Sequence, residues 1–253
     1  MQPSNTPLTA RSVLASTLLG TDPPELSVAN LVRIAGLFGI NENRARVALS
    51  RMVSSGEATT DGAGQYRLLG HLLQRQHRQA ASRSGQTRNW SEGWHLVVVT
   101  ATASAAEVRG RRRQALSFAR LAELRDGFWL RPDNLGLILP DEIGADVTMF
   151  SGASLKDPKH LAATLWDLSQ WAARANDLFT QLRALPPKVP SDLAPGFVLS
   201  AAVLRHFQND PLLPSDLLAR SWPGDKLRRT YDGWDRSYRR LLSQWVNSPA
   251  VRA

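Results

Sequence analysis

The chain has 253 residues, a length that favours two or three small domains over a single hydrophobic core. It contains no cysteine, which excludes disulfides, thiolate metal sites and cysteine nucleophiles, and its five histidines lack the spacing of zinc ligands. The formal net charge of +9 predicts an anionic partner, because basic surfaces attract phosphate groups over long distances.

The sequence also bears on location and cofactors. It contains no run of about 18 consecutive apolar residues, so we expect no membrane span. Residues Met1 to Thr9 do not combine a basic segment with an apolar one, so we expect no signal peptide and a cytoplasmic location. Neither a phosphate-binding glycine loop nor a metal-ligand pattern is visible, so we expect no cofactor and no metal.

Three helices are predicted at the start of the chain. The first carries an apolar stripe that ends at Gly20, and Ser27 is expected to cap a second helix that ends at Gly39. Asn41 is expected to cap a third helix over residues Glu42 to Ser55. A helix, a turn and a second helix in this order are typical of DNA-binding domains.

A hairpin follows the third helix. Two short runs, Glu57 to Thr60 and Gln65 to Leu69, flank the turn sequence Asp61-Gly62-Ala63-Gly64. Helices followed by a hairpin predict a winged helix-turn-helix in residues 1–70.

The middle of the chain is predicted to be a linker and a small sheet. Residues 71–93 are polar and basic and are expected to form a connecting helix and a linker. In residues 94–153 we expect the strand His95 to Val99, a helix from Glu107 to Leu124, and strands at Phe128 to Arg131, Leu137 to Leu139 and Val147 to Phe150. This order predicts a ferredoxin-like domain.

Residues 154–253 are predicted to be a helical domain. The expected helices are Leu161 to Leu185, Gly196 to Phe207 and Lys226 to Trp245. The predicted fold class is therefore α+β, with an N-terminal winged helix-turn-helix, a central ferredoxin-like domain and a C-terminal helical domain.

The third helix has two different faces. At about 100° per residue, its apolar residues share one face, and short polar residues and Val47 lie opposite, flanked by arginines. Such a helix seats on its domain by the apolar face and presents the other face to base edges and phosphates. The candidate DNA-binding residues, including two on the hairpin, are Asn41, Asn43, Arg44, Arg46, Val47, Ser50, Arg51, Ser54, Gln65 and Arg67.

Several motifs occur in an order that resembles one family. They are Phe38-Gly39-Ile40-Asn41-Glu42, Arg46-Val47-Ala48-Leu49-Ser50-Arg51-Met52, Tyr66-Arg67-Leu68, Trp94, Trp166-Asp167-Leu168, Asp210-Pro211-Leu212-Leu213-Pro214 and Trp222-Pro223-Gly224. Together they resemble the PaaX family of phenylacetate-catabolism repressors, over nearly the whole chain.

The resemblance implies a homodimeric repressor that binds a double-stranded DNA operator and responds to an acyl-CoA effector such as phenylacetyl-CoA. Because no catalytic set of residues is visible, we also expect that the protein is not an enzyme. One departure concerns the wing, because the family usually has arginines around the wing glycine, where this chain reads Asp61-Gly62-Ala63-Gly64-Gln65.

An arginine run in the central domain has two interpretations. Arg109, Arg111, Arg112 and Arg113 either bind the phosphates of a coenzyme A effector or form an ordinary solvated helix face. The alternative function from another class is an RNA-binding or structural protein that uses the basic linker and the ferredoxin-like domain. An enzyme acting on an acyl-CoA is disfavoured, because no catalytic set of residues is visible.

Overall fold

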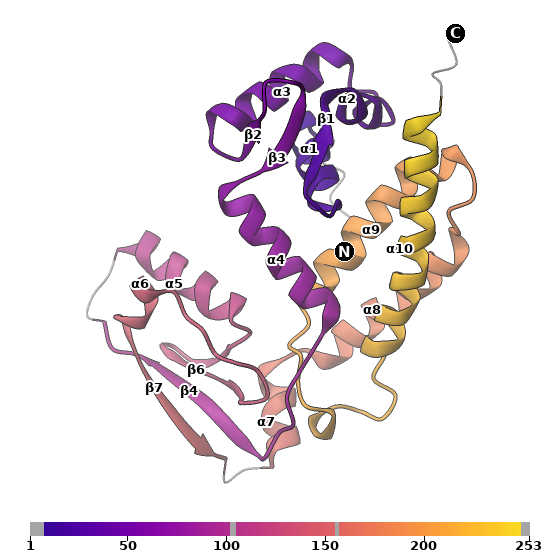
Figure 1. The fold of residues 1–253 in the computed structure, drawn as a ribbon. Coiled ribbons are helices and arrows are strands. Elements are labelled where there is room, and N and C mark those ends of the chain that lie inside the picture. Colours follow the sequence, from indigo (N-terminus) through magenta and orange to yellow (C-terminus); the bar gives the residue numbers. More distant parts are fainter. Residues whose placement is uncertain (1–7, 102–104, 155–156, 249–253) are drawn as a thin grey trace. The chain divides into compact units, whose positions relative to one another are not determined.

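The computed structural model describes residues 8–101, 105–154 and 157–248, and its fold is α+β with two small antiparallel sheets (Figure 1). The chain divides into two compact units. Unit 1 holds Met1–Ser84, Asp177–Gln208 and Lys226–Ala253, and unit 2 holds Gly85–Asn176 and Asn209–Asp225. The sequence predicted domain boundaries at residues 70, 93 and 153. These boundaries stay a prediction.

Unit 1 begins with three helices and three strands. These are α1 (Ala10–Leu19), β1 (Glu25–Ser27), α2 (Val28–Gly36), α3 (Glu42–Ser54), β2 (Ala58–Thr60) and β3 (Gln65–Leu68), and α4 (Gly70–Ser84) follows them. The strands form an antiparallel sheet in the order β1-β3-β2, with Glu25 opposite Arg67 and Thr60 opposite Tyr66. The short strand β1 was not predicted.

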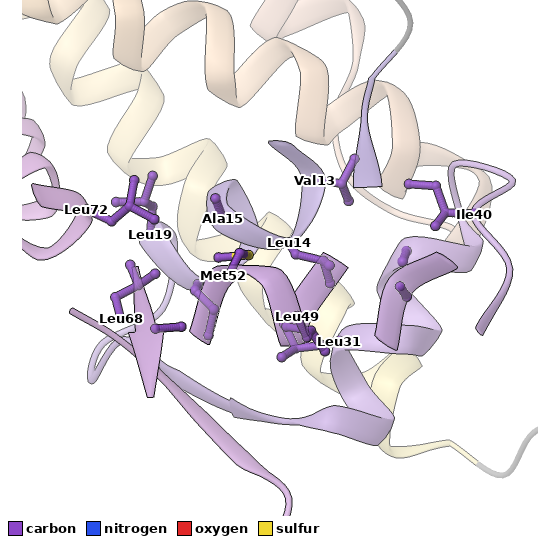
Figure 2. Close-up of a cluster of buried hydrophobic side chains, with 14 residues drawn as sticks. Val13, Leu14, Ala15, Leu19, Leu31, Ile40, Leu49, Met52, Leu68 and Leu72 are labelled. Carbon is purple, nitrogen blue, oxygen red and sulfur yellow. The ribbon is translucent and has the colours of Figure 1, made fainter. Parts of the chain in front are cut away.

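A hydrophobic core holds these elements together. It contains fourteen buried residues: Val13, Leu14, Ala15, Leu18, Leu19, Leu31, Ala35, Ile40, Ala45, Leu49, Met52, Ala58, Leu68 and Leu72. Figure 2 shows Leu14 of α1, Leu31 of α2 and Leu49 of α3 in this cluster. Phe197 of α9 also packs against it, which ties a late segment of the chain to the first one.

Both predicted helix caps are confirmed. The side chain of Ser27 accepts a hydrogen bond from the backbone N–H of Asn30, and Asn41 Oδ1 accepts one from the N–H of Arg44 at 2.9 Å. Each cap satisfies one of the backbone donors that a helix start leaves free.

The rest of unit 1 is helical. It contains the end of α8 (Leu168–Ala184), a short 3-10 helix (Pro190–Asp192), α9 (Leu193–Gln208) and most of α10 (Gly224–Asn247). A side chain at Gly196 in α9 would meet the ring of Tyr238 in α10 at 2.8 Å, so glycine permits these two helices to approach closely. Arg83 of α4 donates hydrogen bonds to Asp232 and Asp235 of α10, both at 2.7 Å.

Unit 2 is built around the second sheet. Its elements are β4 (Gly93–Val99), α5 (Ala106–Phe118), β5 (Ala122–Arg125), β6 (Phe128–Pro132), α6 (Asp141–Gly144), β7 (Val147–Ala153), α7 (Pro158–Leu165) and the first part of α8, with a 3-10 helix at Ser215–Leu217. The strand order is β5-β6-β4-β7, and every neighbouring pair is antiparallel.

A buried arginine connects the sheet of unit 2 to the segment 209–225. Arg131 is fully buried and donates to Asn134 Oδ1 at 3.0 Å, and Asn134 in turn donates to the carbonyl oxygen of Leu212 at 2.8 Å. Burial, with a smaller effect of the nearby Arg120, lowers the pKa of Arg131 to about 9. Backbone carbonyls and an amide therefore satisfy this side chain in the interior.

Two predicted elements of the central region are wrong in part. The helix expected to reach Leu124 ends at Phe118, because Arg120 adopts a left-handed backbone with φ +62°, and Ala122–Arg125 forms β5 instead. The strand expected at Leu137 to Leu139 is absent from the described part of the chain. Its two leucines pack against the sheet core while Ile138 is exposed, so packing produces the alternation without strand pairing.

The long helix expected from Leu161 to Leu185 is two helices. They are α7 and α8, and they are separated at Trp166 and Asp167. The carboxylate of Asp167 accepts a hydrogen bond from the N–H of Gln170 at 2.9 Å, which makes it the cap of α8. The apolar repeat continues through this break, so periodicity alone predicted one helix, although Trp166-Asp167-Leu168 also fits a helix start. Among the described residues, no helix is both long and apolar enough to cross a membrane.

An ion pair beside the hairpin generates a prediction about pH. Glu57 is buried and accepts hydrogen bonds from the guanidinium of Arg11 in α1, which lowers the pKa of Glu57 below its ordinary value of 4.5. A lowered folded-state pKa stabilises the fold above pH 4.5, and that stability is lost as pH falls through the folded value. We expect Glu57→Gln to lose about 1 kcal/mol of unfolding free energy at pH 7 and little at pH 3.

Urea unfolding of both proteins from pH 7 to pH 3 measures this difference. Asp22→Asn, a change at an exposed carboxylate, is the control and should leave the pH profile unchanged. Parallel profiles for the wild type and Glu57→Gln would contradict the assigned role.

Candidate nucleic-acid interface

The helix α3 lies with one face in the core of unit 1. Ala45, Leu49 and Met52 are each at most 1% exposed, so the opposite face of the helix points to solvent. The turn before it contains Gly39 at φ +69°, a backbone conformation that favours glycine. Helix α2 packs against α3 on the other side of this turn. The local sequence thus fixes both the start of α3 and its rotation about its axis.

All predicted contact residues of α3 lie on its exposed side. Asn43, Arg44, Arg46, Val47, Ser50, Arg51 and Ser54 are exposed, and so is the capping residue Asn41. Val47 is 43% exposed although it is apolar, and its methyl groups offer the kind of surface that meets a thymine methyl group. The helix therefore presents amide, hydroxyl, methyl and guanidinium groups together.

The arginines on this face differ in their partners. Arg46 donates to Glu42 at 2.7 Å, and both side chains are more than half exposed. Within the described part of the chain, Arg44 and Arg51 have no ion-pair partner. An exposed pair such as Arg46–Glu42 contributes only about 0.3–0.5 kcal/mol, so a phosphate or a guanine competes with it easily. The i,i+4 spacing of this pair was a usable sequence signal.

The two candidate residues on the hairpin lie on β3, away from the α3 set in the chain. Arg67 donates to Glu25 of β1 at 2.6 and 2.9 Å, a pairing that was missed because β1 itself was not predicted. Gln65 is exposed at the start of the strand. At the tip, Asp61 Oδ1 accepts hydrogen bonds from the N–H groups of Ala63 and Gln65, so this carboxylate stabilises the turn.

The arginine run of α5 divides into different roles. Arg112 is buried and pairs with Asp146 at 2.7 Å, and therefore holds α5 against the loop before β7. Arg113 pairs with Glu123 of β5. Arg109, Arg111 and Arg113 are exposed, so the predicted contact with effector phosphates stays a prediction for these three side chains.

Sequence reasoning missed one arginine that lies behind the helix pair. Arg33 of α2 donates to the carbonyl oxygens of Val246 at 2.8 Å and Ser248 at 2.5 Å, and its guanidinium lies 4.6 Å from the ring centre of Trp245. A cation at the carbonyl end of a helix is favoured by the helix dipole. More than two hundred residues separate the partners, so no local signal reveals the contact. Among the described residues, no three acidic or histidine side chains gather as metal ligands do.

Comparisons with known proteins find a family and a solved structure that are similar to this chain. Residues 9–72, from α1 to the start of α4, match the family described as PaaX-like protein. A solved structure, the uncharacterized protein Rv0674 from Mycobacterium tuberculosis, is 38% identical, with a TM-score of 0.75. The alignment covers 94% of this chain and 98% of that one. No protein among those with curated descriptions matches significantly.

Asn41 and Asn43 lie at the start of α3 and differ in their roles. Asn41 caps the helix, whereas Asn43 has an exposed side chain. Asn41→Ala removes the cap of α3 and should cost about 1 kcal/mol of unfolding free energy. Asn43→Ala changes an exposed side chain and should stay within about 0.5 kcal/mol of the wild type. Urea unfolding followed by circular dichroism measures both, and equal losses in the two variants would contradict the assigned cap.

Proposed function

The chain belongs to the PaaX-like family of transcriptional regulators, and from that premise we propose that α3 is the recognition helix of a winged helix-turn-helix that binds duplex DNA. The supporting observation is the division of α3, whose apolar face is buried while all seven polar, methyl and guanidinium side chains predicted on its outer face are exposed. The order of α2, the Gly39 turn, α3 and the β2–β3 hairpin fits that motif.

The proposal extends to the second unit and to assembly. The order β5-β6-β4-β7, with α5 and α6 in the connections, fits a ferredoxin-like domain. One winged helix reads a short half-site, so a two-fold symmetric operator is read by a homodimer. We propose a repressor of a catabolic operon on the strength of the family resemblance.

The arginines of α3 provide the test of DNA binding. Arg46→Ala and Arg51→Ala should each weaken operator binding, by about 1–3 kcal/mol and at one base position if the side chain contacts a guanine. If it contacts a phosphate instead, the loss is uniform across sequences and the salt slope falls by about one unit. Titration of labelled operator duplexes at several salt concentrations measures both.

A control and a competitor sharpen this experiment. Arg125→Ala removes an exposed arginine from β5 and should leave the affinity unchanged. An RNA duplex of the same sequence should compete poorly, and stronger competition by RNA would favour the RNA-binding alternative. Wild-type affinity in both α3 variants would contradict the assignment of the recognition helix. Light scattering of the wild-type complex should give two copies of the chain per operator.

We further propose that an acyl-CoA effector such as phenylacetyl-CoA releases the operator. A ligand lowers DNA affinity only if it prefers the arrangement that does not bind DNA, so effector and operator must weaken each other by the same factor. Operator affinity with and without phenylacetyl-CoA measures this coupling, which we expect to be roughly 5–150-fold.

The exposed arginines of α5 give the matching variant. Arg111→Gln combined with Arg113→Gln should weaken the response to phenylacetyl-CoA while leaving operator affinity without effector unchanged. The full chain is required here, because α9 and most of α10 pack within unit 1 and a truncation would remove them from it. If no thioester changes operator affinity, the effector proposal fails and the DNA-binding proposal stands.

A further inference from the structure

Unit 1 contains a cavity that none of the features above explains. Its volume is about 880 Å3, within the range of roughly 300–1,000 Å3 that small-molecule sites occupy. Residues of α1, β1 and α2 line one side, and residues of α4, α9 and α10 line the other. The apolar lining residues are Leu19, Leu26, Ile34, Phe197, Ala201, Leu204, Leu242 and Val246.

Two arginines without an ion-pair partner also line this cavity. They are Arg75 of α4 and Arg205 of α9, and among the described residues neither pairs with a carboxylate. The helices that carry them pack against each other. Partial burial and the charge of Arg205 lower the pKa of Arg75, the direction expected where two cations share one wall. An anion placed between them would relieve this repulsion.

The other charged groups of the lining are mostly engaged elsewhere. Glu25 pairs with Arg67, and Asp235 accepts hydrogen bonds from Arg83 at 2.7 Å and Arg239 at 2.8 Å. Asp22 is the one lining carboxylate without an ion-pair partner in the described part of the chain, and it is exposed, as are Arg75 and Arg205. The cavity therefore combines an apolar wall with an unneutralised pair of cations.

Three hydroxyl groups of the lining already have hydrogen-bond partners. The hydroxyl groups of Tyr231 and Ser200 lie 2.8 Å apart as a hydrogen-bonded pair, and Tyr238 donates to the carbonyl oxygen of Leu193 at 3.0 Å. The two tyrosine rings add apolar surface to the lining, while the guanidinium groups offer the charge.

We propose that this cavity binds an organic anion with an apolar body, whose acidic group is held by Arg75 and Arg205. A guanidinium is suited to this role, because its planar donors match carboxylate and phosphate oxygens. The apolar body takes the volume between Phe197, Ile34 and Leu242. The site differs from the arginines of α5, which belong to unit 2.

Occupancy of the cavity bears on α3 through α2; this regulatory clause rests on the proposed DNA-binding function. Ile34 of α2 and Val246 of α10 both line the cavity. The carbonyl oxygen of Val246 also accepts a hydrogen bond from Arg33, which lies next to Ile34 in α2. Helix α2 packs on α3. A ligand that prefers one position of α2 against α10 will therefore shift the affinity for DNA.

The test uses the full chain and a pair of matched probes. The anionic probe is 8-anilinonaphthalene-1-sulfonate, and the neutral one is N-phenyl-1-naphthylamine, which lacks the sulfonate. We expect saturable binding of the anionic probe, followed by fluorescence, and binding of the neutral probe that is at least tenfold weaker. Equal affinity for both probes would overturn the role of the arginines.

Variants locate the site. Arg75→Gln and Arg205→Gln should each weaken the anionic probe roughly tenfold, the loss expected for a charged hydrogen bond. Arg240→Gln, an exposed arginine of α10 outside the lining, is the control and should bind like the wild type. Ala201→Phe fills the cavity without altering a charge and should abolish binding of both probes. Unchanged affinity in Arg75→Gln and Ala201→Phe, with folding verified by circular dichroism, overturns the proposal.

Two competitors distinguish the source of the acidic group. Displacement of the probe by phenylacetate indicates a carboxylate ligand, and displacement by phenylacetyl-CoA alone indicates the phosphates of a thioester. Operator affinity with and without saturating anionic probe tests the regulatory clause, and an unchanged affinity overturns it. Operator binding is measured separately. If the wild-type chain binds the probe but no DNA, the proposed function is contradicted and the cavity assignment still holds.

Discussion

Burial of one stripe of α3 is the constraint on which the rest of unit 1 depends. Ala45, Leu49 and Met52 are removed from water against residues of α1 and α2, and burying side chains of this size contributes roughly 1.5–3 kcal/mol each for the larger two. Rotation of α3 about its axis would expose that stripe, so packing alone decides which residues face outward. Arg46 and Arg51 are exposed because Leu49 and Met52 on the other face are buried. The core therefore fixes the position of any side chain by which α3 recognises a partner.

The late helices complete this unit in a way that the order of the sequence conceals. Phe197 of α9 packs against the first core at 5.0 Å between its ring and that of Phe38, and Arg33 of α2 binds the last carbonyl groups of α10. Contacts with α9 and with the end of α10 therefore hold α2 and the turn before α3 in place. The contact of Arg33 with the end of α10 links α10 to α2, which gives the proposed ligand site in unit 1 a short physical route to the proposed recognition helix.

Local features of the fold were predictable from the sequence, and long-range features were not. The caps Ser27 and Asn41 and the faces of α3 follow from spacing and side-chain chemistry over a few residues, and the structure confirms them. The wrong end of the helix at Leu124 reflects a left-handed Arg120, a conformation without a strong residue signature outside glycine and asparagine. The cavity is assembled from residues between 16 and 247, and no periodicity connects them.

The net charge of +9 does not by itself show where an anion would bind, because many of the arginines are already paired with carboxylates. Arg67 and Arg113 are exposed, yet each already has a carboxylate, so each adds little to the attraction of an anion. Arg112 adds none at the surface, because it is buried with Asp146. Arg44 and Arg51 on α3, by contrast, keep their full charge where the helix faces solvent, and the cavity has its own unneutralised pair. The distribution of unpaired arginines, more than their number, thus separates the proposed surface for a polyanion from the proposed cavity for a small acid.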